Sequence, residues 1–207
     1  MSLTAREINE LKKAPAVDGV LPVFHERWSS RFFADRDVTS ETMAKVFEAA
    51  RWAPSSYNGQ PWRYIVGHKG SDTFQKIAAS LTAFNQSWAG KAPVLIVGCA
   101  ATHFSHNGQE NRYAIYDLGA ATAYLTLQAA AFGLTTHQMA GYDQEKARAA
   151  LGIPQEFVLG AAIAVGYQGD PFGEPEEEIV KRELAPRDRK PLSEIVFSAW
   201  GVAAKLG

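Results

Sequence analysis

The sequence predicts an α+β fold in which helices surround a mixed sheet, and three observations support this class. Apolar side chains recur at helical spacing along residues 39–51, where Met43 and Val46 share a face. A near-continuous apolar run occupies residues 94–99, as expected of a central strand that is covered on both faces. Residues 111–132 form the longest helical stretch and are dense in alanine. Small side chains let another helix approach closely, so we expect this helix to be buried, with a subunit interface as one place for it.

The remaining elements follow from periodicity and from capping residues. Gly133 is expected to end the long helix, because glycine adopts positive φ without strain. In chain order, we expect a helix at 4–12, a Pro/Gly linker at 14–22, a helix at 39–51, a strand at 64–67, a helix at 72–81, a strand at 94–99, the long helix at 111–132, a strand at 135–139, a helix at 143–151 and a strand at 157–167.

The C-terminal part of the chain differs in composition from the rest. Residues 169–191 are rich in Pro, Glu, Lys and Arg, cannot hold a core and are predicted to form an extended arm. The apolar run that follows at 192–197 must be buried against something. We therefore divide a single domain into an N-terminal helix and linker (1–24), a core (25–170) and a C-terminal arm (171–207).

Composition excludes several classes of function. The chain has 207 residues, 46% of them hydrophobic, which is enough for one domain with a substantial core. A net charge of −1 gives no global field that would recruit nucleic acid or an anionic membrane. The single cysteine excludes an internal disulfide, and no stretch reaches the roughly 18 apolar residues that span a bilayer. We expect a cytoplasmic protein that binds neither nucleic acids nor membranes.

A polar loop at residues 52–62 carries the most information. Pro54 and Pro61 bracket small polar residues, a composition that forms turns and presents hydroxyls, amides and backbone N–H groups. Trp52 and Trp62 flank the loop on either side. This pattern favours a site for a flat polar molecule, and the alternative is a rigid connection between a helix and a strand.

Arginines cluster near both ends of the chain. Arg27, Ser29 and Arg31 alternate, so in an extended segment they point to one side. Two guanidiniums and a hydroxyl on one face suit an anion or a ring edge rich in acceptors. Arg187 and Arg189 repeat the spacing. For each pair taken alone, the alternative is a solvated charge cluster.

Taken together, these segments resemble the nitroreductase family of flavin (FMN) enzymes, over about residues 25–197. The resemblance implies a three-layer sandwich with helices around a central mixed, mostly antiparallel sheet. It also implies that the C-terminal arm is exchanged in a homodimer with FMN at the interface. The matching motifs are Arg27-x-Ser29-x-Arg31, Ala53-Pro54-Ser55-Ser56-x-Asn58-x-Gln60-Pro61-Trp62, Ala92-Pro93-Val94-Leu95-Ile96-Val97, Gly133-Leu134 with Gly141-Tyr142-Asp143, and Arg187-x-Arg189-Lys190-Pro191-Leu192-x-Glu194-Ile195-Val196.

The resemblance also implies roles for individual residues in tight, non-covalent FMN binding. Arginines from both ends would hold the phosphate, Arg31 would lie at the N1/O2 edge of the ring, and the 54–58 loop would come from the neighbouring subunit. Asn85 would meet the pyrimidine edge, and backbone N–H groups near Gly141 would serve N5 and O4. The expected FMN-binding residues are Arg27, Trp28, Ser29, Arg31, Pro54, Ser55, Ser56, Asn58, Asn85, Gln138, Met139, Ala140, Gly141, Arg187 and Arg189.

The chain departs from the family pattern where substrate would bind. Some relatives have an acidic residue at the position of Ala140, others have Cys-Trp in place of His137-Gln138, and many have lysine where this chain has Arg31. No catalytic side chain is assigned, because the flavin carries the chemistry. His137 and Phe104 are candidates for the substrate pocket, although His137 is more simply a partly buried histidine whose hydrogen bonds are satisfied.

A second cluster, His103, His106 and Glu110, is not expected to bind a metal, because Asn107 and Gly108 interrupt the helix that would align it. The loop that carries it is expected to cover the flavin.

The implied function is an FMN-dependent oxidoreductase that uses NADH or NADPH to reduce nitroaromatics, quinones or similar electron-poor small molecules. Hydride would pass through flavin N5 in a ping-pong sequence. The sequence contains neither a phosphate loop of the Gly-x4-Gly-Lys type nor a Gly-x-Gly-x2-Gly motif. Binding of the nicotinamide through a Rossmann unit is therefore not supported. Two alternatives remain: an FMN-binding member with a non-reductase role in flavin remodelling, storage or sensing, and a structural dimer without flavin.

Overall fold

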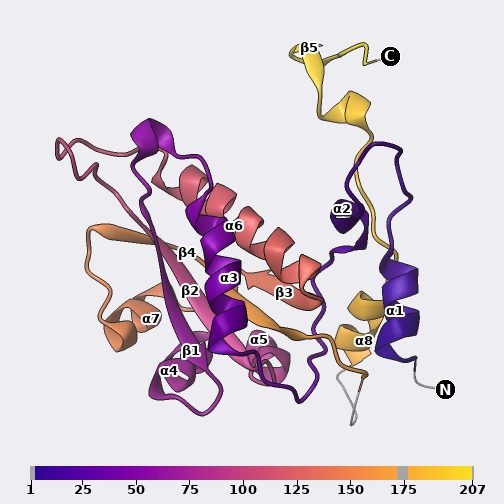
Figure 1. The fold of residues 1–207 in the computed structure, drawn as a ribbon, viewed down its shortest axis with the longest axis horizontal. Helices are drawn as coiled ribbons and strands as arrows, with labels where there is room; N and C mark the ends of the chain where they lie inside the picture. The colour runs from indigo at the N-terminus through magenta and orange to yellow at the C-terminus, as the bar shows by residue number, and fades with distance from the viewer. Residues whose placement is uncertain (1–2, 172–176, 207) are drawn as a thin grey trace.

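A four-stranded antiparallel sheet forms the centre of the chain (Figure 1). The computed structural model describes residues 3–171 and 177–206. The strands are β1 (Trp62–His68), β2 (Val94–Ala101), β3 (Leu134–Met139) and β4 (Phe157–Tyr167), in the order β1-β2-β4-β3. All three pairings among them are antiparallel. The predicted fold class is confirmed, while the exchange of the arm stays a prediction.

Helices cover both faces of this sheet. Helices α3 (Ser40–Arg51) and α6 (Ala114–Ala131) pack on one face, and α4 (Asp72–Ser80), α5 (Ala83–Ala89) and α7 (Gln144–Leu151) pack on the other. Strand β2 lies between the two layers and is buried on both faces, as predicted. Its residues alternate, so that Val94 and Ile96 join one hydrophobic cluster while Leu95 and Val97 join the other.

Two details of these layers bear on the sequence predictions. Helix α5 was not expected, and it begins after Thr82, whose hydroxyl accepts the N–H of Asn85. Gly133 does end α6, with a φ of +72°. In the chain alone, one face of α6 is buried, whereas the face that carries Gly119 and Ala123 is exposed.

The predicted extended arm contains a helix, and this part of the prediction is wrong. Helix α8 (Glu177–Leu184) packs against α1 (Ala5–Lys12) and buries Ile179 and Glu183. The helix forms because Glu178 and Arg182 pair at i,i+4 and because the ammonium of Lys12 donates to C-terminal carbonyls, including Arg182 O at 2.9 Å. Residues 172–176 of the arm lie outside the described residues.

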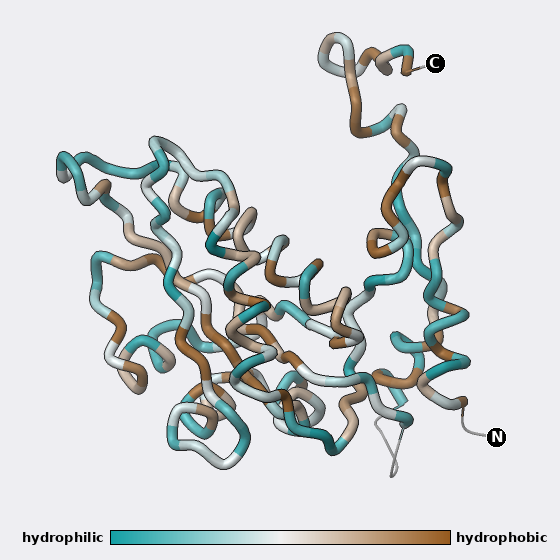
Figure 2. The backbone as a smooth tube through the Cα atoms, viewed as in Figure 1, coloured by the Kyte–Doolittle hydropathy of each residue, from teal (hydrophilic) through white to brown (hydrophobic). Residues whose placement is uncertain are grey.

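The end of the chain stands away from the body. The short helix η2 (Leu192–Glu194) leads to a hairpin of β5 (Phe197–Ala199) and β6 (Val202–Ala203), which extends beyond α2 (Pro22–Glu26) in Figure 1. Figure 2 shows hydrophobic stretches along this tail. Trp200 is 95% exposed and contacts Phe197 within the tail. Over the described part of the chain, no helix combines the length and apolar character that crossing a bilayer requires.

Candidate functional site

The side chains from Arg27 to Arg31 point alternately to opposite sides of an extended segment, as predicted. The segment leaves α2 in an extended conformation at Arg27. Trp28 and Ser30 are buried, whereas Arg27, Ser29 and Arg31 are only partly buried. The indole N–H of Trp28 donates to Asn9 Oδ1 at 2.7 Å, which ties the segment to α1. Trp28 and Ser30 therefore anchor the segment, while Arg27, Ser29 and Arg31 on its other side stay partly accessible.

Arginines from the two ends of the sequence gather beside this segment. Burial first, and then the charges of Arg187 and Arg189, lower the pKa of Arg27. Arg187 donates to the carbonyl oxygens of Lys12, at 3.0 Å, and His25. Within residues 3–171 and 177–206, none of the three arginines pairs with a carboxylate. Three guanidiniums that repel one another without a counter-ion fit an anionic ligand with several acceptor oxygens.

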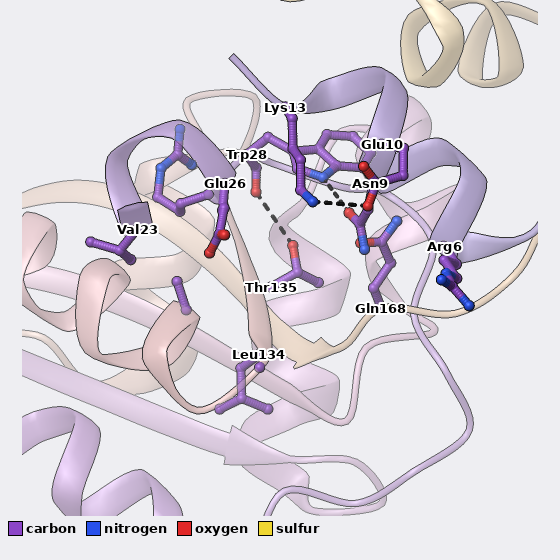
Figure 3. A pocket seen from close by; sticks show the side chains of 13 residues that line it. Arg6, Asn9, Glu10, Lys13, Val23, Glu26, Trp28, Leu134, Thr135 and Gln168 are labelled. Carbon is purple, nitrogen blue, oxygen red and sulfur yellow. Dashed lines mark hydrogen bonds and ion pairs between the residues drawn. The ribbon is translucent and has the colours of Figure 1, made fainter. Parts of the chain in front are cut away.

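Two cavities adjoin Arg27, and they differ in whether carboxylates stand in their linings. The larger, of about 510 Å³, lies between α1 and the start of β3, and its wall has both acidic and basic residues: Glu10, Glu26, Arg6 and Lys13 (Figure 3). The smaller has a volume of about 390 Å³, within the usual range for small-molecule sites. It has no acidic residue in its lining, which consists of Phe24, Arg27, Ser29, Ala123, Thr126, Leu127, Thr136 and Gln138. A phosphate suits the smaller cavity better, because no carboxylate repels it there.

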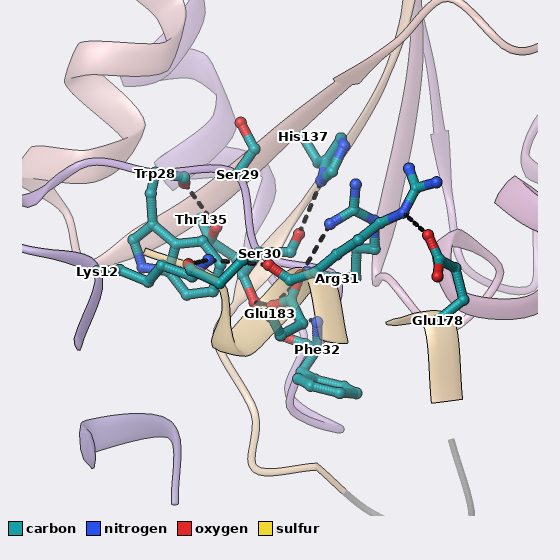
Figure 4. A network of polar contacts seen from close by, with 12 residues as sticks. Lys12, Trp28, Ser29, Ser30, Arg31, Phe32, Thr135, His137, Glu178 and Glu183 are labelled. Atoms are coloured by element: carbon teal, nitrogen blue, oxygen red, sulfur yellow. Dashed lines mark hydrogen bonds and ion pairs between the residues drawn. The ribbon is translucent and has the colours of Figure 1, made fainter. Parts of the chain in front are cut away.

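Arg31 makes a buried ion pair that connects it to helix α8 (Figure 4). Its Nη1 lies 3.0 Å from Glu183 Oε1, and its backbone N–H donates to Glu183 Oε2 at 3.2 Å. The guanidinium stands over the ring of Trp88, 5.6 Å from the ring centroid. Its Nε is buried and has no hydrogen-bond partner among the described residues. Arg31 is thus held in place, and its Nε is a buried donor without a partner among these residues.

His137 lies on β3 next to Arg31. Its ring is 4.5 Å from that of Trp88, and Nδ1 lies 3.2 Å from the carbonyl oxygen of Ser30. Burial, and then the charge of Arg31, lower the pKa of His137 to about 4. The imidazole is therefore neutral near pH 7 and is not a cationic acid there. The surroundings of His137 match the expectation of a partly buried histidine with a hydrogen-bond partner.

The end of β3 brings together further residues of the predicted site. Gln138 and Ala140 are exposed and Met139 is buried. Asn85 Nδ2 donates to the carbonyl oxygen of Gly141 at 2.9 Å. A Cβ on Gly141 would lie 2.6 Å from that Nδ2, so glycine is needed for this close approach. The two segments that were expected to meet a ring edge are therefore adjacent.

The 54–58 loop belongs to a different part of the chain. Its short helix η1 (Ser56–Asn58) is held by the N–H of Ser56, which donates to Asp117 Oδ2 at 3.1 Å. Tyr57 and Asn58 have φ of +51° and +52°, a strained conformation for a tyrosine. Tyr57 is 84% exposed and packs edge-on against Phe104, at 5.6 Å between ring centroids. Pro54 and Ser55 lead into this turn, and Pro54 is exposed.

A single chain does not bring the loop and the arginines together. Asp117, which binds the loop, lies in the first turn of α6, and Leu127 lines the smaller cavity near its other end. Ten residues of α-helix separate these two positions, a rise of about 15 Å. The predicted residues Pro54, Ser55, Ser56, Asn58 and Phe104 therefore lie apart from Arg27, Arg31, Arg187 and Arg189 within one chain. That the loop comes from a second subunit stays a prediction.

Sequence reasoning missed three residues of this region. Trp88 packs against both Arg31 and His137, Asp117 holds the loop, and Glu183 pairs with Arg31. Glu183 lies 152 positions from Arg31 along the chain, and no local pattern predicts such a pair. The i,i+4 spacing of Glu178 and Arg182 could have predicted its helix.

Comparison with known proteins defines the class. A model described as the nitroreductase family matches residues 25–167, and the chain belongs to that family. A Thermus thermophilus protein named NADH dehydrogenase is 30% identical over 214 residues, covering 88% of this chain and 97% of its own length. An uncharacterized Mycolicibacterium smegmatis protein is 37% identical over 148 residues, covering 67% and 97%. A crystal structure described as an oxidoreductase containing FMN superposes with a TM-score of 0.81 at 32% identity, covering 90% of this chain and 94% of its own.

Proposed function

We propose that this protein is a flavin oxidoreductase that holds FMN and takes electrons from NADH or NADPH. The observation that carries the proposal is the group of Arg27, Arg187 and Arg189, which has no counter-ion among the described residues and adjoins a cavity without acidic residues. An FMN phosphate, close to dianionic at neutral pH, would supply the missing charge. The FMN named for the similar crystal structure supports the proposal, as does the name NADH dehydrogenase of the Thermus relative.

The residues along β3 fit the rest of the cofactor. Ser29 shares the smaller cavity with Arg27, and its hydroxyl would bind phosphate or ribityl oxygens. Arg31 would bring its positive charge to the N1/O2 edge of the ring, while Asn85 would meet the pyrimidine edge and backbone N–H groups near Gly141 would serve N5 and O4. When bound, FMN would supply two-electron chemistry between the nicotinamide and an electron-poor acceptor such as a nitroaromatic or a quinone.

We propose further that the working form is a homodimer. The exposed face of α6 carries Ile115, Tyr116 and Tyr124, and the tail carries the nearly fully exposed Trp200. Apolar groups of this size on one chain mark a surface that another chain covers. A second copy would cover both surfaces and would bring its 54–58 loop to the ring end of the site. This arrangement would overcome the separation along α6.

The proposal is tested by loading the protein with FMN under anaerobic conditions. The apoprotein should take up FMN, and either NADH or NADPH should then bleach the flavin. Adding a quinone or a nitroaromatic should restore the yellow colour. A protein that takes up no FMN would contradict the proposal. A protein that retains FMN without bleaching with either nicotinamide would support the non-reductase alternative.

A further inference from the structure

Glu183 is a fully buried carboxylate at the centre of a polar network that joins three parts of the chain (Figure 4). It lies on α8 and accepts hydrogen bonds from the backbone N–H and the Nη1 of Arg31. It also accepts from the hydroxyl of Ser30 at 3.1 Å. These contacts account for both of its oxygens, so the carboxylate has a single, well-defined position.

The surroundings of Glu183 are cationic. Lys12 is also buried, lies over the Trp28 ring at 5.0 Å and is close enough to Glu183 for that carboxylate to raise its pKa, against a larger lowering by burial. Arg187 approaches from the arm and donates to the backbone of Lys12. Removing a buried acid from among cations leaves positive charge uncompensated, which is costly and acts over a long range in a medium of low dielectric.

We propose that Glu183 is a positioning residue that sets how strongly Arg31 acts on the flavin. The carboxylate holds Arg31 through Nη1 and offsets part of its positive charge. This inference rests on the proposed function, because it assumes a flavin beside Arg31. The reduced flavin carries negative charge at its N1/O2 edge, and a positive charge there raises the reduction potential. Because Glu183 offsets part of the charge of Arg31, the flavin has a lower reduction potential with this carboxylate present than it would have without it.

The structure supplies a matched control on the same helix. Glu178 also pairs with an arginine, Arg182, at 2.7 Å, but both side chains are about half exposed. Next to the hydrogen bond with Arg182, the charge of Arg31 is only the smallest of the contributions that shift the pKa of Glu178, and water screens this exposed carboxylate. Glu178→Gln therefore changes the charge of the chain by the same amount as Glu183→Gln while altering the field at Arg31 much less. A difference between the two variants therefore reports on position and not on net charge.

The test measures the midpoint potential of bound FMN, and its dissociation constants in the oxidised and reduced states, for the full-length protein and both variants. Glu183→Gln should favour reduced over oxidised FMN by about tenfold, which for a two-electron couple corresponds to about 30 mV upward. Glu178→Gln should raise the potential by much less, because its carboxylate is exposed and only weakly coupled to Arg31. A Glu183→Gln protein that loses affinity equally for both redox states, with an unchanged potential, would show a merely structural role and overturn the proposal.

A second variant keeps the test decisive if Glu183→Gln fails to fold. Glu183→Asp retains the charge but withdraws it from Nη1, so it should raise the potential by a smaller amount, a few-fold in relative affinity. A folded Glu183→Asp protein with the wild-type potential would also overturn the proposal. Failure of the unaltered protein to take up any FMN would instead contradict the proposed function, which separates the two conclusions.

Discussion

The candidate site has two halves at opposite ends of α6, and they are built differently. The arginine half contains Arg27, Arg31, Arg187 and Arg189 with their neighbours, and the loop half contains residues 54–58. The arginine half rests on buried contacts, because Glu183 has no exposed surface and Trp28 and Ser30 hold the backbone. The loop half is exposed, and Tyr57 adopts a strained backbone conformation. The difference is consistent with the proposal that a second chain contacts the loop half, whereas the contacts that hold the arginine half lie within one chain.

The largest predicted effect concerns His137, in the arginine half. Its pKa in the folded protein, about 4, lies below its ordinary value of 6.5, so the unfolded chain takes up a proton first as the pH falls. The contribution of His137 to the free energy of unfolding is therefore fully present above pH 6.5. It is lost as the pH falls toward 4, and the total loss is about 3 kcal/mol. Urea unfolding of the wild type and of His137→Gln between pH 7 and 4 measures the difference. Parallel pH profiles would show that His137 is not buried as described.

Arg27 gives the next largest effect, on cofactor affinity. Loss of a charge-assisted bond to phosphate costs about 1.5–3 kcal/mol, so Arg27→Ala should weaken FMN binding by about ten- to a hundredfold. Melting of the apoprotein should change little, since Arg27 repels its neighbours. Fluorescence titration with FMN checks the first expectation, with Arg112→Ala as a control because Arg112 is 83% exposed. Equal destabilisation of the apo and FMN-bound forms would assign Arg27 a structural role instead.

The smallest effect concerns Asp117 and the loop half. Asp117→Ala removes the acceptor for the Ser56 N–H and should destabilise the chain by about 1 kcal/mol. Hydrogen exchange at the Ser56 amide should accelerate, while the amides of α4, on the opposite face of the sheet, serve as an internal reference. If exchange at Ser56 is unchanged, the loop is held by other contacts and the comparison of the two halves weakens.

Much of the arginine half could be predicted from sequence, because the information is local. The alternation correctly predicted that Arg27, Ser29 and Arg31 share one side of the segment, opposite the buried Trp28 and Ser30. The apolar run of β2 correctly predicted a strand buried on both faces. These patterns depend on neighbours one or two positions away, which a single sequence displays directly.

The remainder depends on contacts between distant segments. Helix α8 was predicted as extended chain because its composition is polar, yet it is stabilised by α1 and by the ammonium of Lys12. The pairing of Arg31 with Glu183 joins opposite ends of the sequence and has no local pattern. The separation of the loop from Arg27 follows from the length of α6, which becomes informative only once both of its ends have known neighbours.

Whether two chains share each site is measured most directly with mixed dimers. One chain carries Arg27→Ala, and the other carries Tyr57→Gly with Asn58→Gly, substitutions that tolerate the positive φ of both positions. Dimers that contain one of each are isolated with two different tags and assayed for NADH-dependent reduction of a quinone. Shared sites leave one site intact, so a mixed dimer should recover about half of the wild-type rate. A rate no higher than the average of the two parent variants would contradict the account, because it would place each site within a single chain.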